Sequence, residues 1–323
     1  MAMPEVTVQQ VHDLTDRIRG FDLVAANGTS LPPAEPGAHI KLTVTDTSGQ
    51  PVKRSYSIIN PGEPDLYRIA VLREEDGEGG SLYMHQKVKT GDVIEIDLPQ
   101  NDFPLADAAA KTILIAGGIG ITPILAMATA LQKAGTDFVL HYASRNHADM
   151  ALMTEVLDAA NGRCTLYFDG GEASRSMPLP SILGTPEAGK HVYVCGPGGL
   201  IDAVLDTARR NRWASENVHY ERFTTPAAQL DDTSFEVHLA QSGQTFEVPV
   251  GKSVLDVLID EGVDPLYDCK KGNCGICTSV VVAHDGDLSH RDAYLSDSQK
   301  AQNDQMCICV SRMQSGGRLT LDL

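Results

Sequence analysis

The sequence predicts a multidomain chain: an antiparallel β-barrel, then an α/β domain with a parallel sheet, then a small α+β domain. Three observations predict this. Short apolar runs separated by Gly, Pro and Asp turns fill the first hundred residues, strands alternate with helices from residue 112, and five of the seven cysteines fall between residues 269 and 309. A length of 323 residues suits two or three domains. We place the domains at 1–105, 106–225 and 233–323, with a linker at 226–232.

In the first domain the period-2 alternation of apolar and polar residues predicts short strands over residues 39–44, 68–72 and 91–98. Closely spaced strands of this kind are typical of a small antiparallel barrel.

In the second domain strand and helix patterns alternate, which indicates crossovers between parallel strands. Strands are expected at 113–116, 138–142, 164–168 and 191–195, and helices at 123–134, 149–160 and 199–211.

The third domain begins with two strands, 235–239 and 244–250, joined over a turn at Ser242-Gly243. Ser253 is placed to cap a helix over 254–261.

Composition narrows the classes of partner. The chain has 26 basic and 43 acidic residues, a formal charge of −17, which argues against nucleic acid as a partner.

The uncharged stretch 113–132 is broken by Gly117, Gly118, Gly120 and Pro123, so we expect a strand, a tight loop and a buried helix rather than a membrane span. The start, Met1-Ala2-Met3-Pro4, lacks the basic and apolar regions of a secretory signal, and we expect a cytoplasmic protein.

Three cysteines carry the strongest signal. Cys269-x4-Cys274-x2-Cys277, followed by a distant cysteine, is the ligand spacing of a plant-type 2Fe-2S cluster. Gly272 and Gly275 would let the backbone approach the cluster closely. Zinc is the alternative for four cysteines, but its sites usually use paired Cys-x2-Cys steps. Cys307 and Cys309 both remain candidates for the fourth ligand, and spacing from Cys277 favours Cys307.

The residues around the last cysteine resemble a known family. Cys309-Val310-Ser311-Arg312, the preceding His290-Arg291-Asp292 and the terminal Leu319-Thr320-Leu321-Asp322-Leu323 are similar to the ferredoxin ends of the phthalate dioxygenase reductase and vanillate O-demethylase reductase family. The resemblance implies a β-grasp ferredoxin domain whose cluster is held by Cys269, Cys274, Cys277 and Cys309, with Cys307 as a buried thiol.

A flavin signature lies in the barrel. Arg54-Ser55-Tyr56-Ser57 resembles the Arg-x-Tyr-Ser motif of the ferredoxin-reductase superfamily, in which tyrosine stacks on the flavin, serine reaches N5 and arginine pairs with phosphate. Downstream, Gly79-Gly80-Ser81 resembles the turn that receives the phosphate on backbone NH groups. Glu78 stands where relatives often carry arginine. The resemblance implies FMN rather than FAD.

A nicotinamide signature follows in the second domain. Gly117-Gly118-Ile119-Gly120-Ile121-Thr122-Pro123 and Cys195-Gly196-Pro197 each follow a strand, where open α/β sheets bind ligands. They resemble the superfamily elements that line the pyrophosphate and nicotinamide, which implies that Thr122 and Cys195, with Ser57, lie at the reacting ring. Ser144-Arg145 could bind the 2′-phosphate of NADPH, but the resemblance around Asp169, in Tyr167-Phe168-Asp169-Gly170-Gly171, favours NADH.

These three parts predict an oxidoreductase. NADH releases two electrons together and a 2Fe-2S cluster takes one, so a flavin must stand between them. The resemblance implies the reductase component of a two-component Rieske oxygenase, a dioxygenase or demethylase, that passes electrons to the terminal oxygenase. We expect the chain to be a monomer. The alternatives are a donor to a cytochrome P450 or another acceptor, and an electron-carrier module without its own NADH chemistry.

Overall fold

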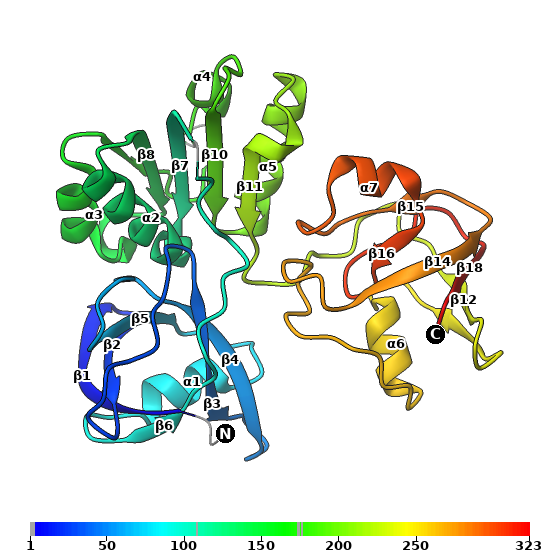
Figure 1. Cartoon of the computed structure of the whole chain (residues 1–323), viewed down its shortest axis with the longest axis horizontal. Helices are drawn as coiled ribbons and strands as arrows, with labels where there is room; N and C mark the ends of the chain where they lie inside the picture. Colours follow the sequence, from blue (N-terminus) through cyan, green and yellow to red (C-terminus); the bar gives the residue numbers. More distant parts are fainter. Residues whose placement is uncertain (1–3, 108, 173–174, 176) are drawn as a thin grey trace. The chain divides into compact units, whose positions relative to one another are not determined.

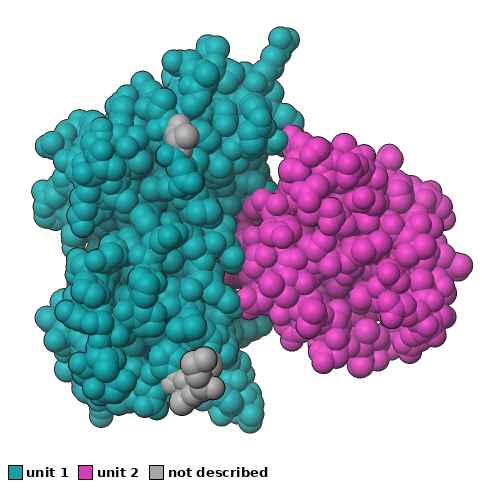
Figure 2. All heavy atoms as spheres, in the orientation of Figure 1, with its two compact units in different colours: residues 1–220 teal, residues 221–323 magenta. Residues whose placement is uncertain are grey.

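The computed structural model describes residues 4–107, 109–172, 175 and 177–323, in two compact units, Met1–Tyr220 and Glu221–Leu323 (Figure 2). Met1, Ala2 and Met3, part of the segment on which the expectation of no secretory signal rests, lie outside the described residues. The three-domain boundaries drawn from the sequence stay a prediction. No helix among the described residues combines the length and the apolar character needed to cross a bilayer.

The first half of unit 1 is an antiparallel barrel (Figure 1). A four-stranded sheet in the order β5-β2-β1-β6 faces the β3–β4 hairpin, and single bridges from His39 to Gln100 and from Leu42 to Ile96 join the two. The elements are β1 (Glu5–Thr15), β2 (Ile18–Ala25), β3 (His39–Thr45), β4 (Pro51–Ser57), β5 (Tyr67–Leu72), α1 (Gly80–Gln86) and β6 (Val93–Glu95).

The strand expected over 91–98 is shorter than its alternating pattern suggests. β6 pairs with β1 only from Val93 to Glu95. Beyond it the chain changes partner, because Asp97 donates its backbone NH to Lys41 of β3 at 2.9 Å and Gln100 donates to His39 at 3.0 Å. The alternation of apolar and polar residues therefore continues beyond Glu95, but the pairing of β6 with β1 ends there.

The second half of unit 1 is an α/β layer structure, as the alternation of strands and helices predicts (Figure 1). Its sheet has the order β11-β10-β7-β8-β9, and β7 pairs in parallel with both β8 and β10. The strand order therefore reverses between β7 and β10. The elements are β7 (Lys111–Gly117), η1 (Gly118–Gly120), α2 (Ile121–Ala134), β8 (Asp137–Ser144), η2 (His147–Asp149), α3 (Met153–Ala160), β9 (Cys164–Phe168), α4 (Leu179–Leu183), β10 (Lys190–Cys195), α5 (Gly198–Arg210), η4 (Ser215–Asn217) and β11 (Val218–Glu221).

Alternate residues of the strands point toward the helices that cover this sheet. Ile113 and Ile115 of β7 pack with Val192 and Val194 of β10 on the core cluster that includes α4 and α5, while α2 packs on α3. The helix expected from 149 begins only at Met153, because Leu152 takes a left-handed backbone with φ 55° that ends the preceding turn.

Unit 2 has a mixed sheet in the order β13-β12-β18-β14-β16, packed on one helix, which is the β-grasp arrangement. β12 and β18 are parallel, and the other pairs are antiparallel. Ser253 caps α6 in a reciprocal capping box with Asp256, as expected. The elements are β12 (Phe235–Leu239), β13 (Thr245–Val248), α6 (Val254–Asp260), β14 (Thr278–His284), β15 (Leu288–Ser289), α7 (Asp297–Gln302), β16 (Gln305–Cys307), β17 (Arg312–Met313) and β18 (Arg318–Leu321).

Candidate functional site

The loop between α6 and β14 gathers the first cysteines around its own backbone. The Cys269 sulfur accepts the backbone NH of Lys271 at 3.4 Å and of Cys274 at 3.5 Å. The neighbouring Cys274 thiol and these NH groups lower the pKa of Cys269 to about 5. A sulfur that is easily deprotonated and already surrounded by NH donors suits an iron ligand, because the thiolate is the form that binds metal.

The remaining cysteines meet at the ends of β14 and β16. The pKa of Cys277 is lowered to about 3 by hydrogen bonds from the thiols of Cys307 and Cys309. Cys307 lies in β16, paired with Thr278, whose hydroxyl is 3.4 Å from its sulfur. Cys309 lies in the turn that follows, where Ser311 donates its backbone NH to the Cys307 carbonyl at 3.0 Å.

Cys307 and Cys309 differ in which other cysteine they reach. The Cys277 thiol, burial and the charges of Cys277 and Cys269 raise the pKa of Cys309, and the backbone NH of Gly272 opposes this. The Cys277 thiol, burial and the charge of Asp292 raise the pKa of Cys307. Both cysteines therefore reach Cys277, but only Cys309 also lies near the charge of Cys269 and the backbone NH of Gly272.

The four predicted ligands lie in two groups, Cys269 with Cys274 and Cys277 with Cys309, and Cys307 also reaches Cys277. Two thiolates for each of two irons is what a 2Fe-2S cluster requires, so the donor set fits this group. Among the residues that the structure describes, no three His, Cys, Asp or Glu side chains converge as ligands of a single ion.

The glycines of this loop are also needed for contacts with protein. A Cβ on Gly272, at φ +79°, would lie 2.8 Å from Val310 and 3.0 Å from Asp292, and a Cβ on Gly275 would meet the Tyr294 ring at 2.4 Å. The sequence predicts a role for these glycines at the cluster only, but Asp292, Tyr294 and Val310 pack so closely against the loop that they leave no room for a side chain there.

The barrel places the flavin motif on β4. Arg54 and Tyr56 lie on one face of the strand, and Ser55 is exposed on the other. Burial raises the pKa of the Tyr56 phenol, and the charge of Arg54 partly offsets this. Ser57 is 5% exposed, and its hydroxyl makes no hydrogen bond within the described part of the chain. A buried hydroxyl of this kind fits a polar atom of a ligand, as expected for flavin.

The glycine turn lies directly beside this motif. Gly79, at φ +89°, is the N-cap of α1, and a Cβ on Gly80 would lie 2.8 Å from Cγ and 2.9 Å from Nε of Arg54. The structure thus brings Arg54 to the first turn of α1, an arrangement that fits a phosphate. The Ser81 hydroxyl accepts the backbone NH of Glu74 at 3.0 Å. The guanidinium of Arg54 is bonded to Glu78.

The two nicotinamide motifs meet backbone to backbone where the strand order reverses. A Cβ on Gly120 would lie 2.3 Å from the carbonyl oxygen of Cys195, and one on Gly196 would lie 3.0 Å from Cα of Gly117. A Cβ on Gly117 would also press on Pro197 at 2.8 Å. Reversal points of this kind are where open α/β sheets bind their ligands.

The other predicted cofactor residues fall into two groups. Thr122 and Cys195 are buried beside this crossing, and the Thr122 hydroxyl donates to the Ile119 carbonyl at 3.0 Å, with Gly118 and Pro123 in the same turn. Ser144, Arg145 and Asp169 meet at the ends of β8 and β9, where Gly170 donates its NH to the Arg145 carbonyl at 2.8 Å and Asp169 donates to the Ser144 carbonyl at 3.3 Å.

Comparisons with known proteins agree with this geometry. Residues 237–314 match the model of the 2Fe-2S iron-sulfur cluster binding domain, and residues 114–206 match that of the oxidoreductase NAD-binding domain. The chain is 38% identical to a vanillate O-demethylase oxidoreductase of Pseudomonas sp. (strain HR199 / DSM 7063), over 99% of this chain and 100% of the relative. It also matches the solved structure of phthalate dioxygenase reductase at TM-score 0.70 and 35% identity, covering 99% and 97% of the two chains.

The chain belongs to the phthalate dioxygenase reductase family. Membership confirms the predicted oxidoreductase, which passes electrons from NADH through FMN to a 2Fe-2S cluster, and it confirms the predicted fold class. The chain also resembles part of an intact type IV self-sufficient cytochrome P450 monooxygenase, at TM-score 0.75 and 32% identity, and spans 41% of that longer chain.

The reductase has anchoring residues that sequence reasoning missed. The Asn273 side chain, inside the cluster loop, donates to the Arg222 carbonyl at 2.9 Å, and the Thr225 hydroxyl donates to the Lys270 carbonyl at 3.1 Å. The stretch before the predicted linker is thus bonded to the cluster loop. A polar residue between two ligand cysteines was the available signal, but its partner lies 51 positions away.

Asp232, at the end of the predicted linker, is bonded to the cluster-bearing unit as well. Arg291 donates to both oxygens of Asp232, and Arg312 lies 3.9 Å from the same carboxylate. Arg312 also donates to the carbonyls of Thr233 and Pro249, at 3.2 and 3.1 Å. Both arginines belong to the segments that carry the family resemblance, so these segments attach the chain after residue 225 to the cluster-bearing unit of the reductase.

Proposed function

We propose that this reductase serves a two-component Rieske oxygenase, a dioxygenase or demethylase. The observation that carries the proposal is similarity over 99% of this chain and the full length of the demethylase oxidoreductase. It is supported by the flavin, nicotinamide and cluster motifs, which follow one another in that order in this sequence. Service to a cytochrome P450 is the second candidate, because this chain matches 41% of an intact self-sufficient P450 monooxygenase chain at TM-score 0.75.

We further propose roles for the residues of unit 1. Thr122, Cys195 and the glycines that pack between β7 and β10 hold the nicotinamide and pyrophosphate, while Ser144, Arg145 and Asp169 hold the far ribose. Ser57 directs its buried hydroxyl to the flavin ring, Tyr56 stacks on that ring, and Arg54 binds the phosphate beside the Gly79–Gly80–Ser81 turn. When bound, FMN accepts a hydride and releases electrons singly. No acid or base is required of the protein, and its side chains serve to position the two rings.

In unit 2 the proposed ligands are Cys269 and Cys274 on one iron and Cys277 and Cys309 on the other. The backbone NH groups of Lys271 and Cys274 stabilise the Cys269 thiolate, and the backbone NH of Gly272 stabilises the Cys309 thiolate. Cys307 is proposed to be a buried thiol and not a ligand. A net charge of −17 favours a docking partner with a basic face, and we propose a cytoplasmic monomer that binds neither nucleic acid nor membrane.

Two measurements test the function. NADH-dependent reduction of cytochrome c should require added FMN after the flavin is stripped from the protein, and its absence would contradict the whole scheme. Coupled turnover should then be compared between a Rieske oxygenase encoded beside this gene and a P450. Turnover with the P450 alone would favour the second candidate.

A further inference from the structure

The acidic residue at the flavin turn is bonded to the arginine of the flavin motif. Oε2 of Glu78 accepts from Nη2 of Arg54, across a sequence separation of 24 residues. The Arg54 side chain is 28% exposed and the Glu78 side chain 85% exposed. The partner of Arg54 is therefore a carboxylate that stands almost entirely in solvent.

Contacts with Lys53 and Gly80 hold one side of the Arg54 side chain, while Glu78 is bonded to the outer nitrogen of its guanidinium. Nη1 of Arg54 donates to the Lys53 carbonyl at 2.9 Å, and its Cγ and Nε pack closely against Gly80 at the first turn of α1. The guanidinium thus stays beside the glycine turn whichever anion it binds. A carboxylate and a phosphate monoester use the same planar N–H edge of arginine.

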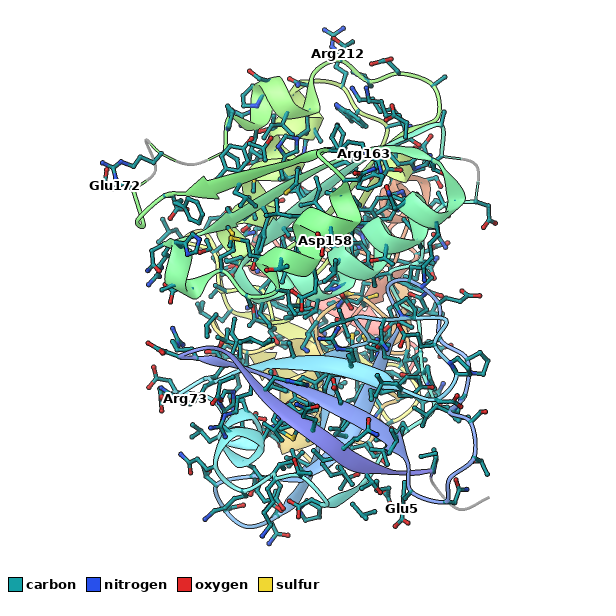
Figure 3. All side chains as sticks on the ribbon, turned by 90° about the vertical axis from the view of Figure 1, so that its left-hand side faces the viewer. Glu5, Arg73, Asp158, Arg163, Glu172 and Arg212 are labelled. Carbon is teal, nitrogen blue, oxygen red and sulfur yellow. The ribbon has the colours of Figure 1, made fainter. Side chains whose placement is uncertain are left out.

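The Glu78 pair contributes little to holding the fold together. Exposed ion pairs are weak, because water screens both charges and ordering two long side chains costs entropy. Glu78 also lies on the loop between β5 and α1, which starts at Arg73 (labelled in Figure 3) and carries Glu74, Glu75 and Asp76 as well. Of these, Glu75 already pairs with Arg73, at 2.7 Å.

We propose that Glu78 is an intramolecular competitor of the FMN phosphate for Arg54, and so sets the affinity of the reductase for its flavin. This inference rests on the proposed function, in which Arg54 binds that phosphate. Binding of FMN exchanges one anion for another at the guanidinium and leaves the displaced Glu78 carboxylate close to a phosphate of like charge. Both effects weaken binding of the phosphate and neither acts on the flavin ring.

The test compares flavins with and without a phosphate. Glu78→Gln should bind FMN about three- to tenfold more tightly than the unaltered protein, as expected for removing one like charge near a solvated site. Riboflavin, which has no phosphate, should bind both proteins equally. Dissociation constants are measured by quenching of flavin fluorescence on the flavin-free holo-cluster protein, at one fixed ionic strength.

Two further variants make the test specific. Glu75→Gln removes one charge from the same loop without touching Arg54, and should leave the FMN affinity nearly unchanged. In an Arg54→Gln background, Glu78→Gln should keep only the part of its effect that comes from like-charge repulsion, so its tightening of FMN should be smaller than in the unaltered protein. Equal tightening by Glu75→Gln, or an unchanged or weaker FMN affinity in Glu78→Gln, would overturn the inference and leave the proposed function intact. An unaltered protein that binds no FMN would overturn both.

Discussion

Arg291 and Asp232 form a forked ion pair in the interior of unit 2: Nη1 of Arg291 lies 3.1 Å from Oδ2 of Asp232, and Nη2 bonds the other oxygen. The side chains are 10% and 2% exposed. The pair joins residues 59 positions apart and brings the predicted linker onto the segment that precedes the last cluster ligand.

Removing the charge of Asp232 should destabilise unit 2. Asp232→Asn leaves Arg291 and Arg312 buried without a counter-ion, which should cost on the order of 3 kcal/mol of unfolding free energy. Urea titration followed by the visible absorbance of the cluster measures this. Glu236→Gln is the control, because the Glu236–Arg318 pair is about half exposed and should be nearly silent. Equal stability of the two variants would contradict the prediction.

The same ion pair predicts a pH dependence. Hydrogen bonding to Arg291 holds the pKa of Asp232 below its usual range. Because the folded pKa is the lower one, the stabilisation is present above the unfolded pKa of about 3.9 and is lost as pH falls through the folded value. The stability difference between the unaltered protein and Asp232→Asn should be constant from pH 7 to pH 5 and shrink below about pH 4. A difference that grows on acidification would have the wrong sign.

The two late cysteines should differ in their effect on the cluster. Cys309→Ser should abolish the assembled 2Fe-2S cluster, whereas Cys307→Ser should keep it, since only Cys309 also lies near Cys269 and the backbone NH of Gly272. Iron content, visible absorbance and the electron paramagnetic resonance of the reduced protein report the result. The reverse pattern would assign the fourth iron bond to Cys307.

The crossing of the two nicotinamide loops should tolerate no side chain. Gly120→Ala places a methyl group 2.3 Å from the Cys195 carbonyl oxygen, so the loops must separate. We expect the KM for NADH to rise at least tenfold, a change of about 1.4 kcal/mol, in ferricyanide reduction. Gly199→Ala, in α5 with nothing within 4 Å of its Cβ, is the matched control and should be neutral. A normal KM in Gly120→Ala would exclude tight packing at this crossing.

Local patterns in the sequence were enough for most of the fold. Strand and helix alternation, the Ser253 cap and the turn at Ser242-Gly243 depend on neighbours within a few residues, and the structure has them where expected. The helix start at Met153 was missed, because nothing in Leu152 signals a left-handed residue. The end of β6 was missed, because the change of partner from β1 to β3 depends on the closure of the barrel.

The site was predictable as a set of motifs but not as a set of contacts. Spacing gave the cluster loop, and the resemblance gave the flavin and nicotinamide residues. The bonds from Arg54 to Glu78 and from Asn273 to Arg222 span 24 and 51 residues, and each depends on how separate elements pack. A single sequence holds no record of such pairs.

The anchoring of residues 222–232 decides where the ferredoxin part can be cut from the chain. A fragment beginning at residue 233, the boundary drawn from the sequence, would lose Asp232 and the bonds of Arg222 and Thr225 to the cluster loop. We expect such a fragment to assemble the cluster poorly, and one beginning at residue 221 to retain it, as iron content after matched expression would reveal. Residues 222–232, which look like a spacer in the sequence, are therefore needed in the smallest fragment that can hold the cluster and carry electrons on its own.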